Sequence, residues 1–206
     1  MKRLLFVNPQ QQLNTPRSIR ITNLTEYLND KYKVHLLYFD LGFGNGAEMQ
    51  HENISHHVIQ LFDKLNTKRL ITDVDNLAVK IRYRIRNYFQ RLKDPFIFET
   101  GKLSDILKQL HLEYRFDKII ISVSPYSSYL ISRNWDTKNL LVFDVGDPLF
   151  KNSGLKGSDK PIFRSIEKEA LESATGVIIT NEATKNFFQS TYQISKDRLI
   201  IIPQGI

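Results

Sequence analysis

Residues 118–148 read KIIISVSPYSSYLISRNWDTKNLLVFDVGDP, and this stretch decides the fold class. Its two apolar runs, 118–123 and 139–143, are continuous rather than alternating, which is typical of strands buried on both faces of a parallel sheet. Ser124 and Pro125 follow the first run directly and predict the start of a helix. The stretch therefore predicts a strand–helix–strand unit of an α/β fold.

The same alternation continues in both directions along the chain. We expect strands at residues 2–7, 34–39, 57–61, 118–123, 139–143, 177–180 and 198–202. We expect helices at residues 15–30, 68–93, 102–112, 124–133, 162–174 and 182–189. This order predicts one α/β domain over residues 1–206, built on a doubly wound, Rossmann-like parallel sheet.

Three predicted helix starts pair a capping residue with proline, and each comes shortly after a predicted strand. They are Thr15-Pro16, Ser124-Pro125 and Asp147-Pro148. In a doubly wound sheet, ligands bind at the carboxyl ends of the strands, beside helix N-termini that favour anions. The pattern therefore predicts where a site lies, although helix capping alone would also explain each pair.

The segment Asp144-Val-Gly-Asp147-Pro148 is the strongest candidate for chemistry. Two carboxylates lie three residues apart just past a strand, and Gly146 permits a tight turn between them. Such a pair can accept hydrogen bonds from sugar hydroxyls, or one member can act as a base. The alternative is that Asp147 caps the next helix and Asp144 satisfies nearby backbone N–H groups.

Two arginines, Arg17 and Arg20, lie in the first turns of the first predicted helix. Arg20 shares a four-residue spacing with Leu24 and Leu28, which predicts that it faces inward. An arginine near the core needs an anionic partner, so this position favours a functional role.

The chain carries a net charge of +7, and most of that excess comes from one segment. Residues 68–93 contain eight basic and two acidic residues, with apolar residues at helical spacing. The candidate membrane-surface residues on this basic helix are Lys80, Arg82, Arg84, Arg86 and Arg91. The open alternatives are a core-packed helix with a solvated charged face, and an acidic partner such as nucleic acid.

Several classes of protein are excluded. The chain has no cysteine, which excludes disulfides and a cysteine nucleophile. No glycine precedes residue 42, which excludes a dinucleotide-binding fingerprint after the first strand. The histidines and glutamates of residues 48–57 match no common ligand spacing, so we expect no metal site. Only four apolar residues follow Met1-Lys2-Arg3, which predicts a strand rather than a signal peptide, and a cytoplasmic protein.

Several landmarks occur in a recognisable order along the chain. They are Asn8-Pro9, Pro16-Arg17-Ser18-Ile19-Arg20, Ser122-Val-Ser124-Pro125, Asp144-Val-Gly-Asp147-Pro148, Ile166-Glu167-Lys168-Glu169-Ala170, Ala174-Thr-Gly-Val177-Ile178-Ile179-Thr180 and Pro203-Gln204-Gly205-Ile206. In this order they resemble the N-terminal, acceptor-binding domain of a family 4 glycosyltransferase, which has the two-domain GT-B fold.

The resemblance implies a division of roles. A C-terminal domain, absent from this sequence, would hold most of the nucleotide-sugar donor, so we expect no cofactor in this domain and no transfer by the 206-residue chain alone. Members retain anomeric configuration without a metal, and many extend lipid-linked surface polysaccharides at the cytoplasmic membrane. That implies a saccharide or lipid-linked acceptor, an anionic membrane surface as a further partner, and a peripheral location. The alternative is a non-catalytic membrane- or nucleic-acid-binding module on a Rossmann-like scaffold.

The resemblance also implies site residues. Asp144 and Asp147 match the aspartates near the acceptor and are the candidate catalytic residues, and Arg20 matches the arginine that opens the family's first helix. The family's glycines near the donor diphosphate are replaced here by glutamines at 10–12. The candidate acceptor-binding residues are Arg17, Arg20, Ser124, Gln11 and Gln12.

Overall fold

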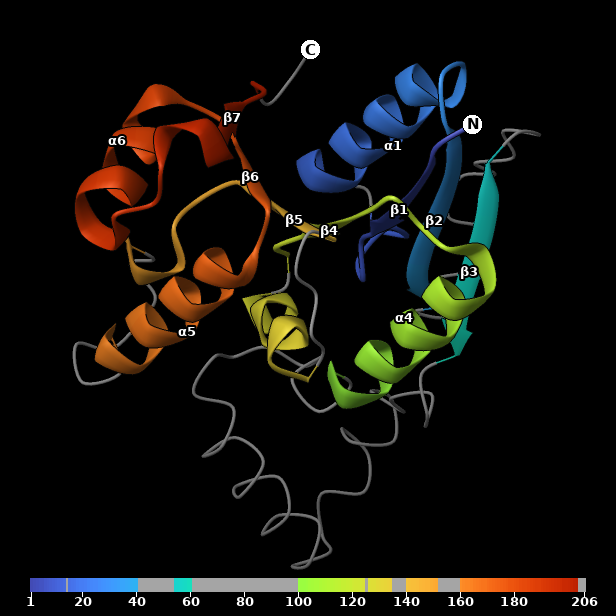
Figure 1. Ribbon diagram of the computed structural model, residues 1–206, viewed down its shortest axis with the longest axis horizontal. Coiled ribbons are helices and arrows are strands. Elements are labelled where there is room, and N and C mark those ends of the chain that lie inside the picture. Colours follow the sequence, from blue (N-terminus) through green and yellow to red (C-terminus); the bar gives the residue numbers. More distant parts are fainter. Residues whose placement is uncertain are drawn as a thin grey trace, which may run out of the picture.

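The protein folds around one parallel sheet. The computed structural model describes residues 1–13, 15–40, 54–60, 100–124, 126–134, 140–151 and 160–203. Within them, seven strands pair in the order β3-β2-β1-β4-β5-β6-β7, and every pairing is parallel (Figure 1). The strands are β1 (Arg3–Val7), β2 (Lys33–Asp40), β3 (Ser55–Gln60), β4 (Lys118–Ser122), β5 (Leu141–Val145), β6 (Gly176–Ile179) and β7 (Leu199–Ile201). The strand order reverses between β1 and β4, as in a doubly wound fold.

Helices cover both faces of the sheet. They are α1 (Pro16–Asn29), α4 (Thr100–Tyr114), η2 (Tyr126–Asn134), η3 (Leu149–Lys151), α5 (Lys160–Ser173), α6 (Glu182–Tyr192) and η5 (Lys196–Arg198). Figure 1 shows α1 on one side of the sheet and α4, η2 and α5 on the other. The prediction of a doubly wound α/β fold is therefore confirmed.

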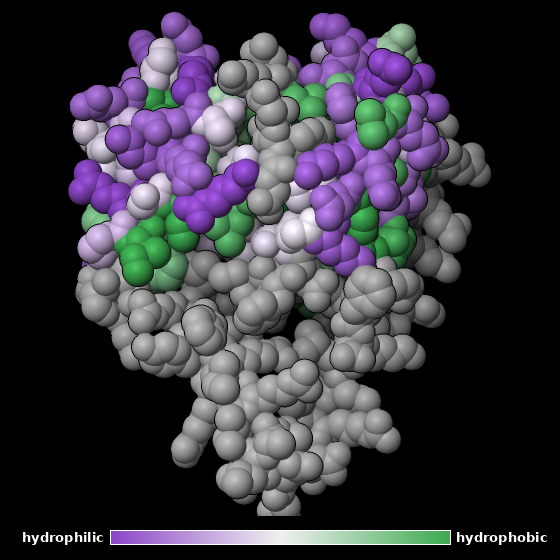
Figure 2. All heavy atoms as spheres, turned by 60° about the horizontal axis from the view of Figure 1, so that its bottom comes forward, coloured by the Kyte–Doolittle hydropathy of each residue, from purple (hydrophilic) through white to green (hydrophobic). Residues whose placement is uncertain are grey.

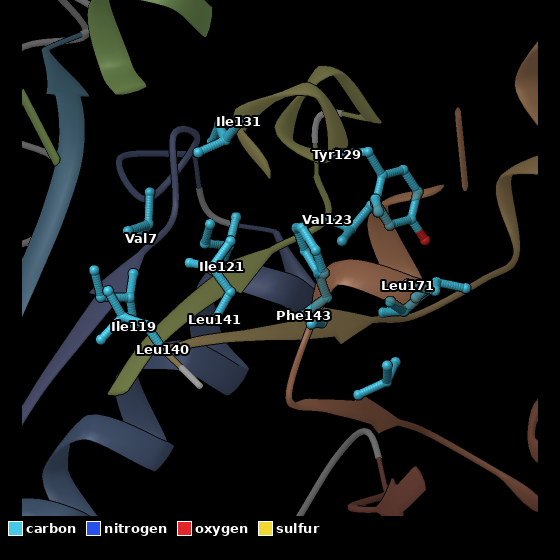
Figure 3. Packing of buried hydrophobic residues seen from close by; sticks show 14 of the residues in the cluster. Val7, Ile119, Ile121, Val123, Tyr129, Ile131, Leu140, Leu141, Phe143 and Leu171 are labelled. Carbon is cyan, nitrogen blue, oxygen red and sulfur yellow. The ribbon is translucent and has the colours of Figure 1, made fainter. Parts of the chain in front are cut away.

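The core explains why the strands are continuous apolar runs. In β1, Leu5 and Val7 pack into the cluster under α4, η2, α5 and α6, whereas Leu4 and Phe6 pack under α1. Figure 3 shows the larger cluster, in which the Tyr129 ring lies 5.4 Å from that of Phe143. Because both faces of the central strands are buried, no polar alternation remains in their sequence.

The first helix begins as its sequence predicts. The Thr15 side chain accepts a hydrogen bond from the Ser18 backbone N–H at 3.1 Å, and the Ser18 hydroxyl accepts one from the Thr15 N–H at 2.9 Å. This capping box, with Pro16 in the first turn, fixes where α1 starts. Arg20 and Ile21 are buried, so the predicted inward face of the helix is confirmed.

Two predicted helices are shorter or tighter than expected. The segment after β4 forms the 3-10 helix η2, and the described residues after Asp147-Pro148 form the single turn η3. In η2 the Ser132 hydroxyl donates to the Tyr129 carbonyl at 3.0 Å, a local bond that competes with the α-helical ladder. This Ser132 bond favours the tighter 3-10 geometry of η2.

The basic helix predicted at residues 68–93, with Lys80, Arg82, Arg84, Arg86 and Arg91, lies outside the described residues. Among the residues that are described, none of the helices has the length and apolar character needed to cross a bilayer. The face seen in Figure 2 is mainly hydrophilic where it is described, and hydrophobic side chains form small separate patches on it.

A buried histidine, His35, pairs with the half-buried His57 on the neighbouring strand. Nδ1 of His35 in β2 lies 2.9 Å from Nε2 of His57 in β3, beside the ring of Tyr114. Burial, together with the positive charges of His57, Lys33 and Arg3, lowers the pKa of His35 from 6.5 to about 4. His35 is therefore neutral at physiological pH.

We predict that this pair makes the fold acid-sensitive. As the pH falls from 6.5 towards 4, His35 becomes protonated in the unfolded chain but stays neutral in the folded protein. The free energy of unfolding therefore decreases. Through this shift, His35 lowers the free energy of unfolding by at most about 3 kcal/mol in acid. His35→Asn lacks this pH-dependent contribution. The difference in free energy of unfolding between wild type and variant, measured by urea denaturation, should therefore become smaller as the pH is lowered from about 7.5 to about 4.5. A difference that does not change with pH would contradict this role.

Candidate functional site

The site lies where the carboxyl ends of the central strands meet. Because the strands are parallel, the segments that follow β1, β4, β5 and β6 all emerge at one edge of the sheet. Across the point where strand order reverses, the Ser124 hydroxyl after β4 donates to the side-chain oxygen of Gln10 after β1 at 3.0 Å. A second bond runs from the Thr180 hydroxyl after β6 to the carbonyl of Gly146 after β5, at 3.3 Å. These two bonds link the four segments in two pairs along this edge of the sheet, which we call the rim.

Asp144 forms a buried ion-pair cluster beneath this rim. Its carboxylate is fully buried and binds Arg17 Nη1 at 2.8 Å and Arg20 Nη2 at 3.2 Å. Arg20 also donates to the backbone carbonyl of Pro203 at 2.6 Å. The predicted anionic partner of Arg20 is therefore Asp144. Both carboxylate oxygens are engaged by the arginines, and of these two arginines Arg17 is the one that lines a hollow at the rim.

Gly146 is required by the position of Arg17. The guanidinium of Arg17 lies directly against the Cα of Gly146, where any side chain would collide with it. The chain bends at Gly146 and Asp147, and the absence of a side chain at Gly146 lets an arginine from α1 approach the backbone.

Asp147 differs sharply from Asp144. It is exposed, and within the described part of the chain it forms no hydrogen bond or ion pair. The alternative that Asp147 caps the following turn does not hold, because the N–H groups of Leu149 and Phe150 are bound by Glu167 instead. Asp147 is thus an open acceptor at the rim.

Two hollows meet at Asp147. One, of about 300 Å³, is lined by Thr15, Pro16, Arg17, Val123, Ser124, Tyr126 and Asp147. The other, of about 470 Å³, is lined by Tyr126, Asp147, Pro148, Lys151, Asn181, Ala183 and Thr184. Tyr126 and Asp147 line both hollows, so the two hollows adjoin at these residues.

The glutamines after β1 have a different position from that expected. Gln11 is buried: it accepts from the side-chain amide of Asn8 at 2.5 Å and donates to the Ser18 carbonyl at 3.2 Å. It fastens the loop to α1 and lines neither hollow. Gln12 is partly buried and is likewise not among the residues lining them.

The structure brings together only part of the predicted set. Arg17, Ser124 and Asp147 line a hollow, whereas Arg20, Asp144 and Gln11 lie beneath or beside it. The residues that sequence reasoning missed are Tyr126, Lys151, Asn181 and Thr184. Their common signal is position, since each follows shortly after a strand that ends at this edge.

The described residues contain no group of three or more histidine, aspartate or glutamate side chains that could hold a metal ion. The remaining candidates of the histidine-rich segment, Glu48, His51 and Glu52, lie outside the residues that the structure describes.

Comparison with solved structures places the fold. The chain superposes on sucrose-phosphate synthase from Thermosynechococcus elongatus with a TM-score of 0.67 at 12% identity, covering 100% of this chain and 49% of that one. It matches a glycosyltransferase from Rickettsia africae ESF-5 with a TM-score of 0.52 at 17% identity, covering 100% and 43%. The chain has the fold of one half of a GT-B glycosyltransferase.

A third match is UGT73P12 from Glycyrrhiza uralensis, solved with glycyrrhetinic acid 3-O-monoglucuronide, with a TM-score of 0.54 at 8% identity and coverage of 95% and 48%. The chain thus spans about half the length of the solved structures it matches. No protein-family model and no curated protein matches it in sequence.

We predict that the two aspartates differ in their effect on stability. Asp144→Asn leaves Arg17 and Arg20 nearly buried without their counter-charge, which should lower the free energy of unfolding by about 3–5 kcal/mol. Asp147→Asn should change it by less than about 0.5 kcal/mol, because Asp147 is exposed and unpaired within the described chain. Urea denaturation of both variants measures this, and equal losses would contradict the distinct placement of the two carboxylates.

Proposed function

We propose that this chain is the acceptor-binding half of a retaining glycosyltransferase that transfers a hexose from a nucleotide-sugar to a saccharide or lipid-linked saccharide. The observation that carries this proposal is the match of the whole chain to half of GT-B proteins, together with an open carboxylate at the ligand edge of the sheet. One fold can support many functions, so the choice of a sugar-binding function has to be argued from the residues of the rim.

The rim has the chemistry of a sugar site. Asp147 accepts hydrogen bonds from acceptor hydroxyls, and Tyr126 places an aromatic side chain beside both hollows. Asn181 lines the larger hollow together with Asp147. Its amide oxygen caps α6 by accepting from the Thr184 N–H at 2.8 Å, and its amide nitrogen donates to the Thr180 hydroxyl at 3.0 Å and keeps a second N–H as a donor. Sugars are recognised by such dense sets of acceptors and donors, so we place the acceptor across this rim.

Asp144 and the arginines supply the support. Arg17 is the cation nearest the smaller hollow, and its position is fixed by Asp144 and by the absence of a side chain at Gly146. Asp144 therefore acts in the site through Arg17, and Arg20 binds the same carboxylate at 3.2 Å. In this proposal the reaction needs no metal, and the donor binds mainly to a second domain.

The chain alone would then bind an acceptor without transferring sugar. We predict that it binds a subset of saccharides on a glycan array, and that Asp147→Asn weakens the tightest interaction about tenfold. That factor corresponds to losing one charge-assisted hydrogen bond of about 1.5 kcal/mol.

The matched control is Asp197→Asn, because Asp197 is also exposed but lies in η5, just before β7, at the opposite edge of the sheet. Equal binding by wild type and Asp147→Asn would contradict the acceptor site. Sugar transfer by this chain from a panel of nucleotide-sugars would contradict the assignment of the donor to a second domain.

We further propose that the enzyme is peripheral at the cytoplasmic face of the membrane and acts in cell-surface polysaccharide synthesis. This part depends on the basic segment 68–93, with its eight basic residues, whose attraction to anionic lipid is about 1 kcal/mol per residue near the surface. Such a surface would bring the chain to a lipid-linked acceptor.

We predict that the chain sediments with vesicles of phosphatidylcholine and phosphatidylserine. The combined variant Arg82→Glu, Arg84→Glu and Arg86→Glu should lower this affinity about 100-fold or more. A matched control has the same charge change on the exposed residues Lys2, Lys33 and Lys196. Unchanged sedimentation of the arginine variant would contradict the membrane proposal, and loss of sedimentation upon adding RNA would favour a nucleic-acid partner.

A further inference from the structure

A buried carboxylate lies directly behind the Asp147 turn. Glu167 is on α5, and its side chain is fully buried. It accepts hydrogen bonds from the backbone N–H of Leu149 at 2.7 Å and of Phe150 at 3.2 Å. The hydroxyls of Tyr129 and Tyr192 donate to it at 3.0 Å and 2.6 Å. Four donors from three other parts of the fold thus converge on one side chain.

The distribution of these donors fits an ionised carboxylate. One oxygen accepts from Leu149 and Tyr129, and the other accepts from Phe150 and Tyr192. Burial raises the pKa of Glu167, while these four hydrogen bonds act in the opposite direction. Burial also raises the pKa of both tyrosines, so their hydroxyls keep the protons that they donate.

The two backbone bonds decide what Asp147 can do. Leu149 and Phe150 are the first residues of η3, and their N–H groups are the ones that a residue just before the turn would normally bind. Because Glu167 binds them from α5, Asp147 has no N–H group to cap. Its carboxylate is left at the rim, where both hollows meet.

We propose that Glu167 is a positioning residue for Asp147, acting through the N–H groups of Leu149 and Phe150. It lines neither hollow and touches no substrate; instead it fixes the turn and keeps Asp147 from folding back as a helix cap. This inference rests on the proposed function, in which Asp147 contacts the acceptor.

The test compares two changes to the same buried network in the full 206-residue chain. Glu167→Gln replaces one accepting oxygen by a donor, which leaves a backbone N–H of the turn unbound. Tyr129→Phe removes a donor to the same carboxylate but leaves both backbone bonds in place. Glu169→Gln, two residues along α5 and paired with Arg133 at the surface, is the control for the substitution itself.

The readouts are calorimetric affinity for the tightest-binding saccharide of the array and amide hydrogen exchange followed by NMR. We expect Glu167→Gln to weaken binding about tenfold and to speed exchange at Leu149 and Phe150 at least tenfold. Tyr129→Phe should leave the affinity within about twofold even where it lowers the melting temperature, and Glu169→Gln should change neither readout.

Each outcome bears on the proposal. Equal loss of affinity in Glu167→Gln and Tyr129→Phe would overturn it, since the network would then be purely structural, and so would unchanged affinity in Glu167→Gln. If Glu167→Gln does not fold, fast exchange at Leu149 and Phe150 in the wild type overturns the proposal and slow exchange supports it. Absence of saccharide binding by the wild type would instead count against the proposed function.

Discussion

The ion-pair cluster of Asp144 is the interaction on which the site depends. One fully buried carboxylate on β5 binds two arginines of α1, and one of these also binds the carbonyl of Pro203 after β7. A buried charge of this kind is tolerated only when its partners stay in place. The cluster therefore fixes the start of α1, the end of β5 and the exit from β7 relative to one another, and two of the four rim segments, those after β1 and β5, adjoin it.

Two aspartates three residues apart consequently have different tasks. Asp144 is on the strand and is covered by α1, and its charge is paired with Arg17 and Arg20 inside the fold. Asp147 is beyond the turn, where Gly146 makes room for Arg17 and Glu167 holds the following backbone. The same residue type thus serves as an anchor in one environment and as an open acceptor in the other.

Patterns within one element were predictable from the sequence, and contacts between distant elements were not. The apolar runs predict the parallel sheet, Thr15 predicts the start of α1, and the spacing of Arg20 predicts that it faces inward. Each of these features depends on residues that are neighbours along the chain. The burial of Gln11 and Glu167 depends on partners that only folding brings together. A glutamate on an amphipathic helix is normally expected to be exposed, so nothing local marks its role.

The most direct test of this account is a crystal structure of the chain soaked with an oligosaccharide that it binds. The account predicts saccharide density along the rim, with a hydroxyl within hydrogen-bonding distance of the Asp147 carboxylate and contacts in both hollows. Density confined to the opposite edge of the sheet, or a saccharide that leaves Asp147 untouched, would contradict it.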